Sequence, residues 1–250
     1  MKITAHCYAL TGLSNIPPWT VNAGFVVGEN QTLVIDTGAN QLSAQTIFGY
    51  ASNMRLQNSL IAVNTEQHLD HLNGNAYFRQ QGVDVYGHYK IKRDEQDQIS
   101  FVEDYNACIT NPVRQQRREA EIFFANTHVV NPNKPLYTQT SFDLGGLEVQ
   151  VVLTPGHTAS NISIFVPTER VLFCGDCVVS AYLPNLEAGT RADWAIWLES
   201  LDKLTLLQPK IIVPGHGEVL MADKVTYEMQ RTRQILQAAI VTGTAPTCNS

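Results

Sequence analysis

The sequence predicts an α/β fold in which two mostly β layers pack together and helices cover their outer faces. Two observations predict this fold. Strand-like apolar runs alternate with amphipathic helical segments between residues 21 and 88, and a second half of similar order begins at residue 138. Such alternation is typical of a layered α/β domain. No linker or repeat interrupts the chain, so we expect one domain over residues 1–250.

The first half of the chain reads as a series of strands and helices, with one loop near the start. A turn at residues 28–31 joins two strands into a hairpin, and a proline pair at Pro17-Pro18 favours a loop over residues 13–19. The predicted elements are strands at residues 21–27 and 32–35, a helix at 41–53, a strand at 60–64, a helix at 72–81 and a strand at 83–88.

Residues 90–125 differ from their surroundings because they are rich in charge and contain no glycine. Apolar residues recur at helical spacing, and Asn111-Pro112 interrupts them, so we predict an insertion of two helices. A loop is expected over residues 129–137. The second half then predicts strands within 138–152 around Gly145-Gly146, at 162–166, 171–173 and 210–213, and helices at 192–206 and 222–241.

Composition and charge exclude several classes of protein. Of 250 residues, 44% are hydrophobic and 16% are charged, which fits a soluble chain with a buried core. The net charge of −6 disfavours nucleic-acid binding through a general basic surface. No apolar run approaches the roughly 20 residues that span a bilayer, and the first residues show no signal-peptide pattern. We expect no membrane and no nucleic-acid partner.

The cysteines are odd in number and scattered along the chain, at Cys7, Cys108, Cys174, Cys177 and Cys248. This pattern fits free thiols in a reducing compartment, so we expect a cytoplasmic protein. Cys174 and Cys177 form a lone C-x-x-C pair. Without a second pair, buried thiols are favoured over a redox or zinc-ribbon site.

Candidate metal ligands follow the ends of predicted strands. Four of them lie within six residues after the strand at 60–64, and three more each follow a later apolar run and a glycine; the seven are Glu66, His68, Asp70, His71, His157, Asp176 and His216. Strand ends can converge at one edge of a sheet, where a rigid scaffold holds functional side chains. Imidazole together with carboxylate suits zinc, iron or manganese better than calcium.

These motifs resemble those of the metallo-β-lactamase-fold superfamily. The resemblance covers nearly the whole chain, from Asp36-Thr37-Gly38 through Thr154-Pro155-Gly156-His157 and Gly175-Asp176 to Pro214-Gly215-His216-Gly217. The family motif H-x-H-x-D-H reads Glu66-Gln67-His68-Leu69-Asp70-His71 here, so a glutamate stands in place of the first histidine. The resemblance implies a four-layer αββα sandwich of two mixed β-sheets, with the helical insertion added around residues 90–125.

The resemblance also implies two metal positions, with zinc expected at both and iron or manganese as alternatives. The first position would use Glu66, His68 and His157, the second Asp70, His71 and His216, and Asp176 would bridge them. A hydroxide held between two such ions is the nucleophile in this family, and Asp70 could orient it or take its proton. Glu66 is a harder ligand than imidazole, which puts full zinc occupancy of the first position in doubt. Cys177 remains an alternative ligand, and Asp36 is expected in a turn or in support of a ligand.

The resemblance implies a metal-dependent hydrolase that acts on a small ester, thioester, lactone or amide. A β-lactamase is an alternative, although the missing secretion signal argues against it. A non-haem iron oxidoreductase is a second alternative because Glu66 enriches the site in carboxylate, and a catalytically weak metal-binding or ligand-sensing protein is a third. The predicted partner is a small-molecule substrate, and the oligomeric state, including a homo-oligomer, stays open.

Overall fold

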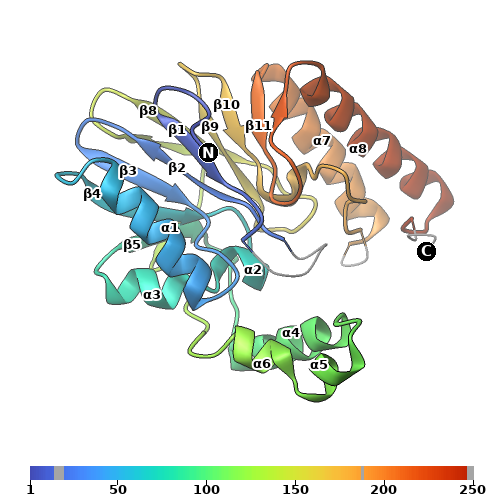
Figure 1. Ribbon diagram of the computed structural model, residues 1–250. Coiled ribbons are helices and arrows are strands. Elements are labelled where there is room, and N and C mark those ends of the chain that lie inside the picture. Colours follow the sequence, from blue (N-terminus) through green and yellow to red (C-terminus); the bar gives the residue numbers. More distant parts are fainter. Residues whose placement is uncertain (14–19, 187–188, 247–250) are drawn as a thin grey trace.

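The computed structural model describes residues 1–13, 20–186 and 189–246, and two six-stranded mixed sheets lie at its centre (Figure 1). Helices α1 (Gln41–Met54) and α3 (Asn75–Gln80) lie on the outer side of one sheet. Helices α7 (Arg191–Leu206) and α8 (Asp223–Thr242) lie on the outer side of the other. The predicted αββα sandwich of two mixed sheets is confirmed.

The first sheet has the strand order β1-β2-β3-β4-β5-β6. Its strands are β1 (Cys7–Leu10), β2 (Ala23–Val27), β3 (Gln31–Ile35), β4 (Ser59–Asn64), β5 (Asp84–His88) and β6 (Lys134–Leu136). The hairpin β2–β3 is antiparallel, whereas β3 to β6 run parallel because helices cross over between them. Along β3, Leu33 and Ile35 pack between the sheets while Val34 packs under α1, as the period of two requires.

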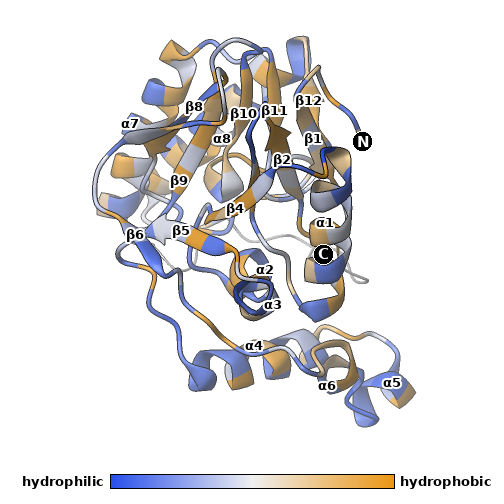
Figure 2. Ribbon diagram, turned by 90° about the vertical axis from the view of Figure 1, so that its left-hand side faces the viewer, coloured by the Kyte–Doolittle hydropathy of each residue, from blue (hydrophilic) through white to orange (hydrophobic). Residues whose placement is uncertain are grey.

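The second sheet has the order β12-β11-β10-β9-β8-β7. Its strands are β7 (Thr140–Asp143), β8 (Glu148–Leu153), β9 (Ile162–Val166), β10 (Val171–Phe173), β11 (Ile211–Val213) and β12 (Leu220–Met221). Strands β10 and β11 are parallel and are joined through α7, and the other pairs are antiparallel. The hydrophobic colour in Figure 2 is concentrated on the strands of both sheets, where the core lies. None of the helices in the described ranges is long and apolar enough to cross a membrane.

The chain after β4 departs from the predicted single helix at residues 72–81. It forms a one-turn helix, α2 (Leu69–Leu72), followed by α3, with Asn73-Gly74 between them. A Cβ atom on Gly74 would lie 2.0 Å from the carbonyl oxygen of Thr37, so only glycine lets the two segments approach this closely. Asp70 and His71 therefore lie on a helix and not in a turn.

Some other predicted elements were also wrong in detail. The expected loop at 129–137 contains β6, and β12 was not predicted because it has only two residues. The loop expected at residues 13–19 lies, apart from Leu13, outside the described residues.

The insertion forms three helices, α4 (Glu95–Ala107), α5 (Pro112–Gln116) and α6 (Glu119–Phe123), where two were predicted. The break at Asn111-Pro112 is confirmed, because Asn111 caps α5. A left-handed backbone at Arg118 (φ 55°) then separates α5 from α6. Both ribbon views place the insertion beyond the end of the sandwich that carries α2 (Figures 1 and 2). An aromatic cluster attaches it to Val21 and Ala39 of the sandwich, through Phe101, Tyr105, Phe123 and Phe124.

Candidate metal centre

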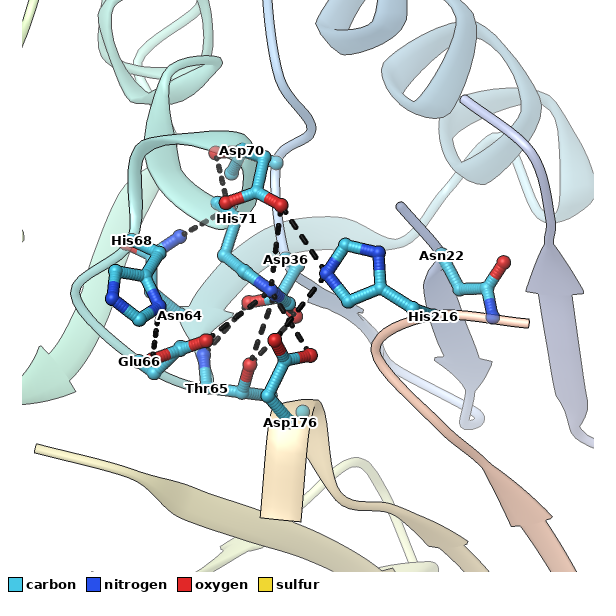
Figure 3. Close-up of polar contacts among 12 residues, drawn as sticks. Asn22, Asp36, Asn64, Thr65, Glu66, His68, Asp70, His71, Asp176 and His216 are labelled. Carbon is cyan, nitrogen blue, oxygen red and sulfur yellow. Dashed lines mark hydrogen bonds and ion pairs between the residues drawn. The ribbon is translucent and has the colours of Figure 1, made fainter. Parts of the chain in front are cut away.

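The structure brings all seven predicted ligands together at one end of the sandwich. The segment from β4 into α2 carries four of them, the β8–β9 loop carries His157, a 3₁₀ turn after β10 carries Asp176, and the loop after β11 carries His216. Figure 3 shows six of these side chains converging, namely Glu66, His68, Asp70, His71, Asp176 and His216. Loops that follow the inner strands of two packed sheets meet here, as the sequence predicts.

The first ligand group contains Glu66, His68, His157 and Asp176, whose candidate ligand atoms lie within 4.8 Å of one another. The Glu66 carboxylate lies 3.1 Å from His68 Nδ1 and 3.3 Å from His157 Nε2. His157 Nε2 lies 3.5 Å from Asp176 Oδ2. The Glu66 carboxylate also reaches the second group, because its Oε1 lies 3.3 Å from His71 Nε2.

The second ligand group contains Asp70, His71 and His216, again within 4.8 Å. His216 Nε2 lies 3.3 Å from Asp70 Oδ2, and His71 Nε2 lies 4.0 Å from the same oxygen. The Asp176 carboxylate reaches this group as well, at 3.4 Å from His71 Nε2 and 3.3 Å from His216 Nε2. Asp176 therefore lies between the two groups, where a bridging ligand would be.

Hydrogen bonds from the far side of the imidazole rings orient three of the histidines. His71 Nδ1 lies 2.9 Å from Asp36 Oδ2, and Asp36 in turn accepts from the backbone N–H and the hydroxyl of Thr65, both at 2.7 Å. Asp36 has a left-handed backbone (φ 60°), which aspartate tolerates better than most residues. Its position matches the expected role in support of a ligand.

Backbone carbonyls orient the other two histidines. His216 Nδ1 lies 3.0 Å from the carbonyl oxygen of Thr20, and His157 Nδ1 lies 3.3 Å from that of Asn185. In each ring the other nitrogen, Nε2, faces the cluster. Sequence reasoning missed Thr20 and Asn185, because a backbone carbonyl carries no residue signature. It also missed Thr65, whose hydroxyl and backbone N–H hold Asp36.

A glycine makes room for the cluster. A Cβ atom on Gly215 would lie 1.9 Å from Asp176 Oδ1 and 3.0 Å from His71 Cε1. No side chain larger than glycine fits between the β11 loop and these two ligands. This explains why a glycine directly precedes His216, the last candidate ligand.

Burial and charge at the cluster fit a bound cation. Both Glu66 oxygens, His71 Nε2 and Asp176 Oδ1 are buried and form no hydrogen bond within the described part of the chain. Such atoms are costly in a folded protein, by about 1–3 kcal/mol each or more when charged. Burial alone would lower the pKa of His71, but Asp36, Asp70 and Asp176 raise it well above its usual value. The same negative potential attracts a metal ion, and carboxylates with imidazoles suit zinc, iron or manganese.

A cavity of about 420 Å³ opens above the ligands. His68, Asp70, His157, Asp176 and His216 line its floor. One wall belongs to the insertion, with Arg93, Asp97, Ser100, Phe101 and Asp104. The opposite wall is the loop after Asp176, with Val179, Tyr182, Leu183 and Asn185. The volume of the cavity is in the range of small-molecule sites.

The alternative ligand Cys177 lies outside both groups. Cys174 and Cys177 are fully buried in the hydrophobic cluster beneath α7, which also contains Trp197. Burial raises the pKa of Cys177 to about 12, so the group is a thiol at neutral pH. The interpretation of this pair as buried thiols fits its environment.

Comparison with known proteins identifies the class that this fold and site define. The family model of the metallo-beta-lactamase superfamily matches residues 16–216. The chain belongs to the metallo-beta-lactamase superfamily.

Individual relatives agree with this assignment. The chain is 35% identical over 109 residues to Beta-lactamase-like protein 2 homolog of Drosophila melanogaster, covering 41% of the chain and 35% of the relative. It is 33% identical over 103 residues to Atrochrysone carboxyl ACP thioesterase of Aspergillus fumigatus, covering 39% of the chain and 31% of the relative. The matched region thus spans about a third of the length of these relatives.

A solved structure extends the likeness to the whole fold. A metallo-beta-lactamase from Pontibacter korlensis superposes with a TM-score of 0.68 at 22% identity, covering 95% of this chain and 97% of that one. At this level of identity, the likeness establishes the fold.

Proposed function

We propose that the protein is a metal-dependent hydrolase that cleaves a small ester, thioester, lactone or amide. One observation carries the proposal: the seven candidate ligands cluster beneath a 420 Å³ cavity that could hold a small molecule, and five of them line its floor. The relation to a thioesterase is in keeping with an acyl substrate. The cleavage adds water across the bond between the acyl carbon and its heteroatom, and it releases an acid and an alcohol, thiol or amine.

The residues of the chain would hold the metal and move the protons. Glu66, His68 and His157 would hold one ion, Asp70, His71 and His216 the other, and Asp176 would contact both. When bound, the ions would polarise the carbonyl of the substrate and lower the pKa of a water molecule towards neutrality. Asp70 lines the cavity, so its carboxylate is placed to take a proton from the attacking water. Asp36 would keep the His71 Nε2 lone pair directed at the cluster.

We propose two zinc ions as the resident metal, with iron or manganese as alternatives at the first group. Imidazole outnumbers carboxylate in the second group, which favours zinc there. In the first group Glu66 adds a hard, negatively charged ligand that iron and manganese accept more readily.

A β-lactamase is the second candidate, favoured by the likeness to a metallo-beta-lactamase along 95% of the chain. Both candidates use the same ligands and differ in the acyl compound that the cavity accepts. The walls formed by the insertion and by residues 179–185 therefore decide between them.

The test is turnover by metal-defined protein. The purified chain would be loaded with zinc, iron or manganese and assayed on esters, thioesters, lactones, amides and β-lactams, with Asp70→Asn and metal-free protein as controls. We expect zinc-dependent hydrolysis of an ester or thioester that Asp70→Asn reduces by about 100-fold or more. Exclusive hydrolysis of β-lactams would favour the second candidate, and iron with a visible spectrum would favour an oxidoreductase. Tight metal binding without turnover would favour a sensing protein.

We also propose that the chain works as one domain in the cytoplasm. Cys7, Cys174 and Cys177 are buried free thiols, which a reducing compartment preserves. Subcellular fractionation with thiol labelling tests the location, and a single unfolding transition tests the domain count.

A further inference from the structure

We propose that the cavity selects a substrate whose non-reacting end is positively charged, such as an alkylammonium group, and that Asp104 receives this charge. The inference rests on the proposed function, because it concerns the same cavity. It adds the charge of the substrate, which the ligand cluster does not specify.

One face of helix α4 forms the wall opposite the 179–185 loop. Asp97, Ser100, Phe101 and Asp104 line the cavity, and their spacing of three, four and seven residues places them on one side of a helix. Arg93, just before the helix, completes this wall. The polar side chains that line the cavity and are not candidate metal ligands thus come from two places, the helical insertion and the loop after Asp176.

The charges on this wall do not balance. Arg93 is the only lysine or arginine that lines the described cavity. Its Nε donates to the carbonyl oxygen of Gln67 at 2.9 Å, and its Nη1 donates to Asp97 Oδ1 at 3.2 Å. Asp97 is therefore neutralised by its neighbour one helical turn away.

Asp104 has no such partner in the part of the chain that the structure describes. Within the described residues no hydrogen bond or ion pair reaches its carboxylate, and the side chain is exposed to the cavity. With Asp97 and Arg93 paired, Asp104 leaves one net negative charge on the wall. A cationic group on the substrate would compensate it, whereas a carboxylate would be repelled.

Aromatic rings line the same space and suit the same ligand. Phe101 lies on the α4 wall and Tyr182 on the opposite loop. The faces of such rings attract alkylammonium groups, and their bodies accommodate the methyl groups. A carboxylate and two aromatic side chains around one cavity therefore favour an organic cation over an anion of the same size.

The experiment compares acetyl esters of three alcohols on zinc-loaded protein. The alcohols end in trimethylammonium, in its uncharged isostere tert-butyl, or in carboxylate. We expect kcat/KM to be highest for the cation and lowest for the anion. Asp104→Asn should lower kcat/KM for the cationic ester by about threefold to fivefold, the range of an exposed ion pair, mainly through KM. The value for the tert-butyl ester should not change, and added salt should reduce the preference.

Glu95→Gln is the matched control. Glu95 is exposed on the same helix and outside the cavity, so its substitution removes the same charge without touching the proposed contact. We expect this variant to keep the full preference for the cationic ester. An equal loss in Glu95→Gln would assign the effect to long-range charge and overturn the role of Asp104.

Direct binding separates this inference from the proposed function. NMR titration would measure the affinity of (2-hydroxyethyl)trimethylammonium and of 3,3-dimethylbutanol for zinc-loaded protein. The inference is supported if the cation binds more tightly than 3,3-dimethylbutanol and Asp104→Asn abolishes this difference. This holds even if no ester is cleaved, because the absence of cleavage would count only against the proposed hydrolase. Equal binding of both alcohols, or a preference for the carboxylate ester through Arg93, would overturn the inference. In that case any observed turnover would still support the proposed hydrolase.

Discussion

The two ligand groups of the candidate centre differ in how they are held. In the second group His71 is fully buried, and Asp36 and Thr65 fix its ring through three short hydrogen bonds. In the first group the His68 side chain is 27% exposed, and the group contains the buried carboxylate of Glu66. The second group is thus a prearranged set of ligands, whereas the first depends on the balance of charge around Glu66. The following predictions test that contrast.

Loss of the shared ligand should have the largest effect. Asp176 contacts histidines of both groups at 3.3–3.5 Å, so Asp176→Ala should weaken metal binding at both, by more than the roughly 100-fold typical of a lost supporting residue. Activity should fall with the metal content, measured by elemental analysis and turnover. Asp202→Ala, which breaks a surface ion pair with Arg233, is the control and should retain both. Full metal content in Asp176→Ala would remove Asp176 from the ligand set.

His157→Ala should distinguish the groups. It removes a ligand of the first group and leaves the second intact. We expect one ion per chain in the variant, against the two proposed for the parent protein, together with loss of most activity. Two ions in this variant would show that His157 is not a ligand.

Gly215→Ala should also disturb both groups, without removing any ligand. The added Cβ would meet Asp176 Oδ1 and His71 Cε1, so the loop or the carboxylate must move. We expect metal affinity to fall by about 10–100-fold, as for other changes next to ligands, measured by chelator competition. Gly49→Ala is the matched control, because a Cβ there meets nothing within 4 Å, and it should leave affinity unchanged. Equal affinities in the two variants would contradict the close packing described here.

Asp36→Asn should act on the second group alone. Asparagine keeps the shape but loses the charge that Asp36 presents to His71 Nδ1 and to Thr65. Metal affinity at the second group should fall by about 10-fold or more, whereas metal affinity at the first group should not change. Isothermal titration with two resolved binding steps measures this, and equal weakening of both steps would mean that the groups are not independent.

Glu66→His should raise the zinc affinity of the first group, because imidazole replaces a hard carboxylate. The expected result is a modest increase in zinc content at limiting zinc, with a smaller change at the second group, whose His71 Nε2 lies 3.3 Å from Glu66 Oε1. If zinc uptake stays the same, Glu66 is already a competent zinc ligand or lies outside the coordination shell.

A site at a distance from the centre should affect stability and not metal content. Glu169, in the β9–β10 turn, accepts from Thr4 Oγ1 and from the backbone N–H of His6. Burial alone would raise its pKa, but the side chains of Thr4, His6 and Cys7, with His6 Nδ1 2.6 Å from Oε1, outweigh it and lower the pKa below the usual 4.5. The Glu169 carboxylate therefore stabilises the fold at pH values above its pKa in the unfolded chain. This contribution is lost as the pH falls through its lower pKa in the folded protein.

Glu169→Gln should destabilise the protein by about 1 kcal/mol at pH 7. The difference from the parent protein should shrink below about pH 4.5, the ordinary value of this group. Urea unfolding at several pH values, with metal content as the control, tests this. A difference that does not depend on pH would assign the effect to packing.

Sequence patterns predicted the layers and the ligands because both follow from local rules. The apolar runs at residues 32–35 and 162–166 predicted central strands that are buried on both faces. The motif spacing predicted which side chains would meet. The break at Gly74 depends on contact with Thr37, 37 residues earlier, and the support of His157 depends on a backbone carbonyl at Asn185. Such long-range contacts leave no periodic signal, so neither feature could be read from the sequence.

The most direct measurement is X-ray anomalous scattering at the zinc edge from crystals of zinc-loaded protein. If the seven side chains bind metal, one peak will lie among Glu66, His68, His157 and Asp176, and a second among Asp70, His71, His216 and Asp176. Ligand distances should be close to the roughly 2.0–2.2 Å of zinc bound to nitrogen or oxygen. Anomalous peaks confined to other parts of the molecule, with no peak between these side chains, would contradict the assignment of a metal centre.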